Sequence, residues 1–218
     1  MNAEWIGYAL GAYLMGAIPF GKIIAGSVAR IDITRRGSGN IGATNVAREL
    51  GMKWGIATLI LDALKGLVPV LIFSSYHSGG GLSLEMGTAI VGVCALTGHQ
   101  FSVFMNFRGG KGVATALGVY LVISPLSCLG GLIVFILTVA KWDTISLGSM
   151  FAAAVMPLFF LVLGKPFPLI MGALLMAILI CIQHWENIQR LIKGEERKWR
   201  KRPHQPSRSS NRSSSSSE

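Results

Sequence analysis

The sequence predicts an all-α polytopic membrane protein: a bundle of seven transmembrane helices with its N-terminus outside and its C-terminus in the cytoplasm. Composition is the first reason, because 51% of the 218 residues are hydrophobic and only 14% are charged, whereas soluble domains carry about 25% charged residues. The second is that the apolar residues fall in segments close to the roughly 20 residues that cross a bilayer. The third is the placement of the positive charges.

The apolar segments run through most of the chain. The first five residues contain Glu4 but no lysine or arginine, which is unlike a cleaved signal peptide. We expect spans at residues 5–28, 54–75, 85–104, 112–124, 126–140, 146–163 and 168–183. The stretch 112–140 is interrupted by Ser124-Pro125, so its length fits either one long kinked span or two short ones.

The distribution of lysine and arginine decides between six and seven spans, because these residues in short loops mark the cytoplasmic side. With seven spans, 17 of the 20 Lys and Arg residues lie on one side. Only Lys165 lies on the other side, and Lys22 and Lys65 lie within spans. Six spans would place the basic C-terminal tail opposite the first basic loop, residues 30–53. Seven spans therefore fit the charge pattern better.

The end of the chain differs in composition from the rest. We divide the sequence into a transmembrane domain, residues 1–196, and a basic Ser-rich disordered cytoplasmic tail, residues 197–218. The tail has too few apolar residues to form a core. Its basic beginning suits anionic lipid headgroups; a regulatory or nucleic-acid-binding tail is the alternative. We expect no nucleic-acid partner, because much of the net charge of +10 is explained by topology.

Three polar stretches interrupt the apolar pattern, all on the predicted cytoplasmic side. The first, residues 36–48, reads RGSGNIGATNVAR. Its glycines allow a tight turn, after which Ser38 or Asn40 can cap a helix. Asn40, Thr44 and Arg48 then recur at helical spacing on one face. A helix N-terminus beside an arginine suits a phosphate group; a capped amphipathic connecting helix is the alternative.

The second polar stretch consists of Gly98-His99 and residues 107–115, which read FRGGKGVAT. Glycines on both sides of Lys111 let backbone amides approach an anion, and the lysine adds a positive charge. The stretch is not a nucleotide-binding P-loop, because Gly112 stands where that motif needs Ser or Thr. A plain glycine turn with an anchoring lysine is the alternative.

The third polar stretch, residues 184–191, reads HWENIQRL and is followed by GEERK at 194–198. His184 and Asn187 are three residues apart, so on a helix they address one site. A histidine there can act as a general base or as a hydrogen-bond donor. The alternative is an interfacial helix leaving the membrane, with Trp185 in the aromatic belt.

Two ionisable residues, Asp62 and Lys65, are predicted within the second span at helical spacing. Charged groups in a membrane are costly and are usually paired. The pair therefore either holds the bundle together or supports an anion site.

Three motifs occur together: SGNxGATNxxR at 38–48, GH at 98–99 with FxGGKGVAT at 107–115, and HxxNIxRL at 184–191 with GxExK at 194–198. In residues, order and separation they resemble the bacterial PlsY family of membrane acyl-phosphate:glycerol-3-phosphate acyltransferases. The resemblance runs from the first span to about Lys198, and the Ser-rich tail departs from it.

This resemblance implies a seven-helix enzyme of the bacterial cytoplasmic (inner) membrane, with its active site facing the cytoplasm. It would transfer an acyl group from acyl phosphate to the 1-hydroxyl of glycerol 3-phosphate. The products would be 1-acyl-glycerol 3-phosphate (lysophosphatidate) and inorganic phosphate, the first step of phosphatidic acid and phospholipid synthesis. The expected partners are these two substrates and the lipid bilayer, with no metal and no cofactor. Neither acyl-chain preference nor oligomeric state is indicated.

The resemblance also assigns residues. Phosphate-holding positions correspond to Ser38, Arg48, Lys111 and the loop 109–112, and His184 and Asn187 match a polar pair of the third motif. We therefore expect the catalytic residues to be His184, Asn187, Lys111 and Arg48. We expect the substrate-binding residues to be Ser38, Asn40, Thr44, Asn45, Arg48, Arg108, Gly109, Gly110, Lys111 and Gly112.

The chemistry of an acyl phosphate fits such a site, because this mixed anhydride is already activated and needs no covalent intermediate. The protein must hold two phosphate-bearing substrates together and orient a hydroxyl toward the carbonyl. The hydroxyl proton has two acceptors, His184 or a substrate phosphate oxygen. An organic-anion transporter is the non-enzyme alternative, but the predicted outer side offers few polar groups beyond His77 and Lys165.

We predict that deletion of residues 207–218 leaves acyl transfer unchanged, because this Ser-rich segment lies outside the three motifs. The measurement is the turnover of the detergent-purified truncated protein beside the full chain. A large loss of turnover would show that the tail takes part in the reaction.

Overall fold

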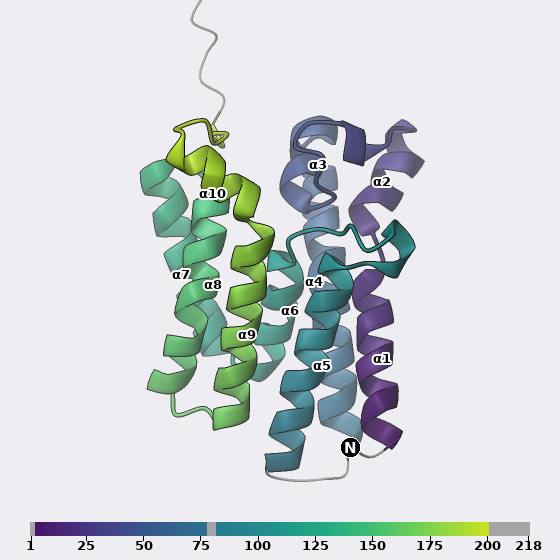
Figure 1. Ribbon diagram of the computed structural model, residues 1–218, viewed down its shortest axis with the longest axis vertical. Coiled ribbons are helices and arrows are strands. Elements are labelled where there is room, and N and C mark those ends of the chain that lie inside the picture. Colours follow the sequence, from purple (N-terminus) through teal and green to yellow (C-terminus); the bar gives the residue numbers. More distant parts are fainter. Residues whose placement is uncertain (1–2, 78–81, 201–218) are drawn as a thin grey trace, which may run out of the picture.

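The computed structural model describes residues 3–77 and 82–200, and every regular element in these ranges is a helix (Figure 1). The helices of the bundle are α1 (Ala3–Ala17), α2 (Phe20–Ala29), α4 (Met52–Tyr76), α5 (Leu82–Gln100), α6 (Val113–Ile123), α7 (Pro125–Trp142), α8 (Ile145–Val162) and α9 (Phe167–Gln183). Shorter elements are α3 (Ala43–Leu50), α10 (Trp185–Ile192) and the 3₁₀ turns Ile33–Arg35 and Val103–Met105. The predicted helical class is confirmed.

The seven apolar segments expected from the sequence form helices, with a break at Ile18-Pro19 in the first and the end of the helix at Gln100 in the third. Among the described residues, five spans are long and apolar enough to cross a membrane, with α1 and α2 counted together as Glu4–Ala29. The bent pair α9–α10 gives a sixth if it is one span. The remaining apolar helix, α6, has 11 residues, a length of about 16 Å against a hydrocarbon core of about 30 Å. Seven crossings therefore remain a prediction.

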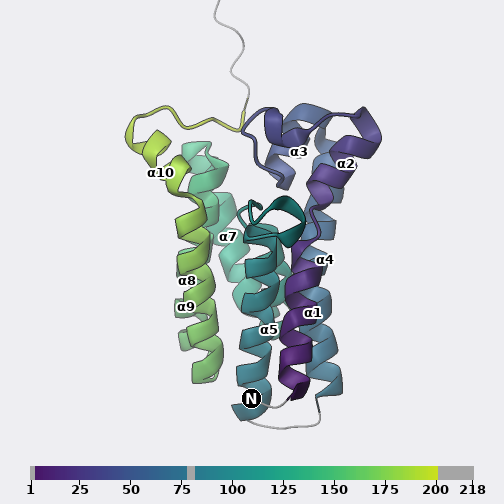
Figure 2. The ribbon, with the colours of Figure 1, turned by 45° about the vertical axis from the view of Figure 1, so that its right-hand side comes forward.

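The short length of α6 follows from the segment before it. In Figures 1 and 2, the loop that joins α5 to α6 lies deeper in the bundle than α3 and α10. Asn106 and Phe107 both have positive φ values, 50° and 60°, and turn the chain there. Because α6 begins at this depth, fewer residues bring it to the opposite end. The loop also places Lys111 inside the bundle.

The interruption at Ser124-Pro125 separates two helices, as the two-span interpretation predicted. α6 ends at Ile123 and α7 begins at Pro125, where a missing N–H costs nothing in the first turn of a helix. The hydroxyls of Ser124 and Ser127 are 2.8 Å apart and buried. The helices α6 and α7 then pack against each other.

A second break, between α1 and α2 at Ile18-Pro19, is held by the ionisable pair. The Lys65 ammonium donates to the Ile18 carbonyl at 2.8 Å and lies 3.0 Å from a carboxylate oxygen of Asp62. Polar backbone groups at membrane depth need internal partners, and Lys65 supplies one. The predicted Asp62–Lys65 ion pair is present and holds the bundle together.

The helices pack in two groups, which meet where α5 packs on α9 and where α6 contacts α7. α1 packs on α5 and α4 on α6, while α7 packs on α8 and α8 on α9. α4 and α6 approach closely because Gly66 of α4 and Gly118 of α6 each lie against the other helix. A Cβ at either position would overlap a carbonyl oxygen of that helix. Such small residues are typical of helix contacts in membranes.

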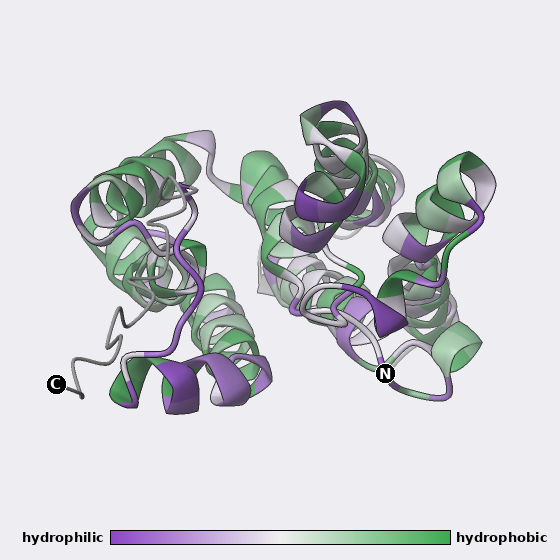
Figure 3. Cartoon of the chain, turned by 90° about the horizontal axis from the view of Figure 1, so that it is seen from above, coloured by the Kyte–Doolittle hydropathy of each residue, from purple (hydrophilic) through white to green (hydrophobic). Residues whose placement is uncertain are grey.

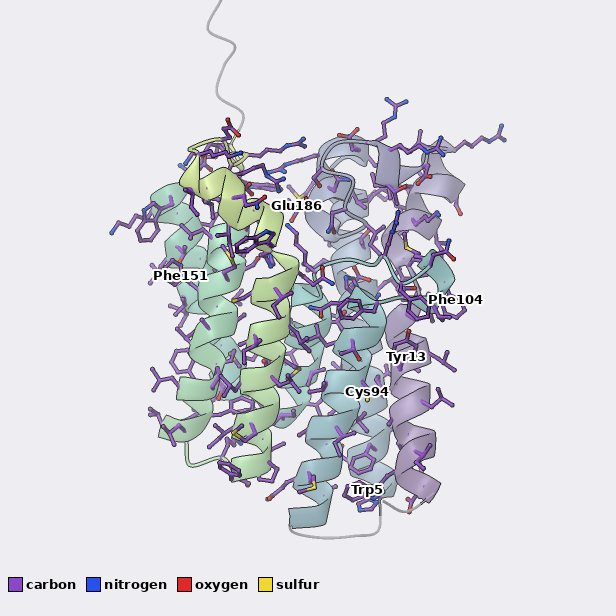
Figure 4. All side chains as sticks on the ribbon, in the orientation of Figure 1. Trp5, Tyr13, Cys94, Phe104, Phe151 and Glu186 are labelled. Atoms are coloured by element: carbon purple, nitrogen blue, oxygen red, sulfur yellow. The ribbon has the colours of Figure 1, made fainter. Side chains whose placement is uncertain are left out.

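The outer faces of the helices are apolar. Leu137 is 64% exposed and Phe167 is 72% exposed, as suits side chains in contact with lipid. Figure 4 shows Phe151 on this outer surface, with Trp5 near the end that carries the N-terminus and Glu186 at the other end.

The polar elements gather at one end of the bundle. α3, α10 and the segments around them lie at the end opposite to the N-terminus (Figure 1). Seen from that end in Figure 3, hydrophilic residues lie on the short helices and connections, and hydrophobic ones on the outer helix faces. This agrees with the placement of the first and third polar stretches on one side; which side faces the cytoplasm remains a prediction.

Candidate active site

A cavity of about 380 Å³ lies between α3 and α4 on one side and α7, α8 and α10 on the other, with α6 behind it. Its lining changes character along its length. The polar end, near α3 and α10, is lined by Ser38, Asn40, Thr44, Arg48, Lys111, His184, Asn187, Arg190, Glu196 and Arg197. The apolar body is lined by Ile56, Leu59, Leu117, Tyr120, Leu132, Phe135 and Met156. The three motifs therefore meet at one site.

Most of the predicted site residues line this cavity. They are Ser38, Asn40, Thr44, Asn45, Arg48, Lys111, Gly112, His184 and Asn187. The predicted substrate-binding residues Arg108, Gly109 and Gly110 do not line it. Arg108 is exposed, because its backbone closes a turn onto Met105 before the chain enters the bundle.

The glycine loop differs from the expected anion cradle because two of its amides are already used. The Gly109 N–H donates to the Gln100 carbonyl at 3.0 Å, and the Gly110 N–H donates to the His99 carbonyl at 3.1 Å. The Gln100 side-chain amide also donates to the Lys111 carbonyl at 3.0 Å. These bonds strap the loop to the end of α5, so its glycines position Lys111.

Two helix N-termini reach the polar end of the cavity instead. α3 begins after Gly42, and Gly42, Ala43 and Thr44 line the cavity. α6 begins after Gly112, and Gly112, Val113 and Ala114 line it too. The first N–H groups of a helix have no partner within the helix, and they favour an anion. The backbone contribution to an anion site therefore comes from these two helix ends.

Two cationic side chains predicted from the motifs, Arg48 and Lys111, are half-buried beside these helix ends. Burial lowers the pKa of Lys111 to about 8, against the raising effect of the Glu196 carboxylate. Burial and the neighbouring guanidinium of Arg197 lower the pKa of Arg48. Because burial disfavours the charged form of both side chains, a bound anion beside them would stabilise their charges.

The predicted substrate-binding residue Asn45 organises the first polar stretch. Its side-chain NH₂ donates to the carbonyls of Arg36 and Asn40, at 3.1 and 2.9 Å. Its oxygen accepts the Ser38 N–H at 2.9 Å. Because both ends of this buried amide serve the loop, Asn45 shapes the stretch that carries Ser38 and Asn40. The Asn40 side chain caps the Gly42 N–H at 2.8 Å.

The third polar stretch is tied together by a carboxylate, Glu196. It accepts from Asn187 at 2.6 Å, Ser146 at 2.7 Å and Arg190 at 2.8 Å. Burial alone would raise its pKa, but these three hydrogen bonds lower the pKa of Glu196. The Asn187 oxygen accepts a hydrogen bond from the Lys111 ammonium. Glu196 thus fixes Asn187, which in turn contacts Lys111.

His184 is buried in the cavity wall between α9 and α10. Its Nδ1 lies 2.8 Å from the Ile180 carbonyl oxygen. Because a carbonyl can only accept, Nδ1 carries the proton in the neutral ring, and Nε2 keeps its lone pair. The histidine therefore offers a hydrogen-bond acceptor.

The buried pair Asp62–Lys65 also extends to the cavity. Asp62 and His99 both line it, and His99 Nδ1 lies 3.8 Å from an Asp62 carboxylate oxygen. The His99 carbonyl is the acceptor that holds Gly110. The pair thus has a structural contact through Lys65 and a path to the Lys111 loop through His99.

Sequence reasoning missed Glu196, Arg197 and Trp199 as cavity residues. The predicted tail begins at residue 197, and residues 197–200 contact the rest of the chain through two side-chain and two backbone donors. Their polar composition resembles a disordered tail, and only Glu196 carried a signal, as part of the third motif. Residues 201–218 lie outside the described ranges.

A bundle of apolar helices with a cavity that is cationic at one end and apolar along its body defines a class: a membrane protein whose site suits an amphiphile with an anionic head. Comparison with known proteins narrows this class. A family model described as glycerol-3-phosphate acyltransferase matches residues 6–194. The chain belongs to this family, which is a family of acyltransferases.

Its relatives agree along nearly their full length. The glycerol-3-phosphate acyltransferases of Trichlorobacter lovleyi and Geobacter sulfurreducens are 50% and 49% identical over 190 residues, which is 87% of this chain and 95% and 94% of theirs. The crystal structure of PlsY (YgiH), an integral membrane glycerol 3-phosphate acyltransferase, in its glycerol 3-phosphate form matches with a TM-score of 0.83 and 38% identity. That match covers 90% of this chain and 96% of PlsY. The resemblance to the PlsY family is confirmed.

We predict that Glu196→Gln loosens the polar end of the cavity. Hydrogen bonds to a charged group contribute about 1.5–3 kcal/mol each, and the Glu196 side chain is only 8% exposed. The unfolding temperature of the detergent-purified protein should fall by several degrees. Glu195→Gln is the matched control, because its side chain is exposed and does not line the cavity. Equal unfolding temperatures in the two variants would contradict this role.

Proposed function

We propose that this protein transfers an acyl group from acyl phosphate to the 1-hydroxyl of glycerol 3-phosphate, at the cytoplasmic face of a bacterial cell membrane. The products are 1-acyl-glycerol 3-phosphate and inorganic phosphate, which begins phosphatidic acid synthesis. Support comes from the family, whose PlsY members are solved in glycerol 3-phosphate and lysophosphatidic acid forms.

The observation that carries the proposal is the joining of two environments in one cavity. Arg48, Lys111 and the N-termini of α3 and α6 make the polar end cationic, while the body between α4, α6, α7 and α8 is apolar. An acyl phosphate is an anion on a hydrocarbon chain, so it fits along this axis. Glycerol 3-phosphate needs only the polar end.

The reaction needs positioning and charge neutralisation more than a nucleophile from the protein. The 1-hydroxyl oxygen attacks the carbonyl carbon of the acyl phosphate and forms the ester bond. The bond from that carbon to the bridging phosphate oxygen then breaks, and phosphate leaves. Two phosphate groups repel each other, and the guanidinium of Arg48, the ammonium of Lys111 and the helix ends offset this repulsion.

The hydroxyl proton has two acceptors in this arrangement. The first is Nε2 of His184, since Nδ1 is engaged with Ile180. The second is an oxygen of the departing phosphate, which needs no protein group. Asn187, fixed by Glu196 and Lys111, is placed to orient the hydroxyl beside His184 on the same cavity wall.

The test is an assay of the detergent-purified full chain with acyl phosphate and glycerol 3-phosphate. We expect phosphate release that depends on both substrates, with formation of the 1-acyl product. Lys111→Ala should remove turnover while the protein still inserts into membranes, and Lys141→Gln, an exposed lysine outside the cavity, should behave as wild type. Hydrolysis without transfer, or uptake of glycerol 3-phosphate into liposomes without chemistry, would refute the proposal.

We predict that the apparent KM for glycerol 3-phosphate rises above pH 8. Because burial lowers the pKa of Lys111 to about 8, the ammonium is about 90% present at pH 7 and about 10% present at pH 9. The substrate phosphate stays doubly ionised throughout, with a pKa of about 6. The KM should therefore rise by up to about tenfold between pH 7 and pH 9.

Lys111→Arg provides the control for this pH dependence, because a guanidinium stays charged over the whole range. The variant should show a KM that changes little between pH 7 and pH 9. If the wild-type KM is flat, or if Lys111→Arg keeps the same rise, Lys111 is not the titrating group.

A further inference from the structure

The segment after α10, residues 195–200, crosses the polar end of the cavity. We call this segment the C-terminal strap. Figure 2 shows it running from α10 toward α3, and Glu196, Arg197 and Trp199 line the cavity. The match to the family model ends at residue 194, so the strap lies beyond it.

The strap is fixed to both sides of the cavity. On the side of α7 and α8, the Trp199 N–H donates to the Asp143 carbonyl at 2.9 Å, and the Arg200 N–H donates to the Asp143 carboxylate at 3.0 Å. The Lys198 ammonium donates to the Trp142 carbonyl at 3.0 Å. On the side of α3, the Arg197 guanidinium donates to the Gly37 carbonyl at 3.1 Å.

The strap brings a third guanidinium to the cavity that Arg48 and Arg190 already line. Arg197 lines the cavity with Arg48 and Lys111, and it helps to lower the pKa of Arg48, after burial. The carboxylate closest in sequence, Glu196, already accepts from Asn187, Ser146 and Arg190. Arg190 is paired with Glu196, whereas Arg48, Lys111 and Arg197 line the same cavity with no carboxylate of the described residues bonded to them. A bound anion would offset the repulsion among these three cations.

The hydrogen bond to Gly37 leaves other N–H donors of Arg197 available. A guanidinium has five N–H donors in a planar fork, and this contact uses one of them. Arg197 is exposed overall, so its remaining donors are accessible from the cavity and from solvent. Carboxylates and phosphates are the groups that such a fork binds through two bonds.

Trp199 contacts the other arginine. The Arg48 guanidinium carbon lies 5.9 Å from the centre of the half-buried Trp199 ring, within the range of a cation–π interaction. Arg48 projects from α3, so this ring of the strap restricts where the Arg48 guanidinium lies.

We propose that Arg197 is a further substrate-binding residue, which contacts a phosphate group together with Arg48, and that Trp199 is a positioning residue for Arg48. The inference rests on the proposed function for the identity of the phosphate, which belongs either to glycerol 3-phosphate or to acyl phosphate. The strap is then part of the active site, and the site is completed by residues beyond the match to the family model, which ends at residue 194.

The experiment compares full-length Arg197→Gln, Arg197→Lys and Arg200→Gln, all purified in detergent. Arg200 is the matched control, because it is an exposed arginine of the strap whose contact is made by its backbone. Calorimetry measures binding of glycerol 3-phosphate and of inorganic phosphate. Arg197→Gln should weaken binding roughly tenfold, as expected for a lost hydrogen bond to a charged group, while Arg200→Gln should bind as wild type.

Kinetics then assign the phosphate and separate binding from folding. A rise in KM for glycerol 3-phosphate alone, or for acyl phosphate alone, identifies the substrate that Arg197 contacts, and kcat should change less than KM. Arg197→Lys should recover part of the affinity, which loss of a merely structural contact would not predict. Trp199→Phe should retain the KM of wild type, and Trp199→Leu should raise it.

The outcomes distinguish the two proposals. If the wild type binds phosphate but does not transfer acyl groups, the proposed function fails, and the binding of Arg197→Gln still tests the strap. If Arg197→Gln binds both anions and turns over like Arg200→Gln, with an unchanged unfolding temperature, Arg197 does not contact the substrate. If its unfolding temperature falls and Arg197→Lys recovers no affinity, Arg197 is only an anchor for the strap.

Discussion

The carboxylate of Glu196 is the contact on which the polar end of the cavity depends. It joins α8 through Ser146 and α10 through Asn187 and Arg190. The Asn187 side-chain oxygen in turn accepts a hydrogen bond from the Lys111 ammonium, and Lys111 comes from a loop far away in the sequence. Without this negative charge, Arg190 would lose the carboxylate it is bonded to, and Lys111 would lose the nearby charge that opposes the effect of its burial.

The cavity combines two requirements that oppose each other. Hydrocarbon is best held by apolar helices, and phosphate is best held by cations and free backbone N–H groups. The bundle separates them along one axis: α4, α6, α7 and α8 line the apolar body, and the ends of α3 and α6 line the polar end. Because α6 begins deep in the bundle, its N-terminus lies within the bundle. For the same reason the helix is short.

Buried polar groups elsewhere in the bundle serve this arrangement. Lys65 closes the break between α1 and α2, and Asp62 reaches His99, whose carbonyl holds the loop before Lys111. The strap encloses the polar end from the other direction, by contacts with Gly37 and Asp143. The polar end of the cavity is therefore held from α5 on one side and from the strap on the other.

Much of this protein was readable from its residues. The sequence was enough to predict the apolar segments, the break at Ser124-Pro125 and the family motifs. Each depends on local composition or short spacing, so no knowledge of the fold is needed. The hydrogen bonds of the loop amides could not be predicted from the sequence. The N–H groups of Gly109 and Gly110 donate to carbonyls of α5, and no rule of sequence spacing pairs these groups. Nor could the place of Arg197 and Trp199 be predicted, since a basic polar segment looks the same whether it is solvated or lies across a cavity. Local chemistry indicated the groups that suit an anion, whereas long-range packing decided which of them line the cavity.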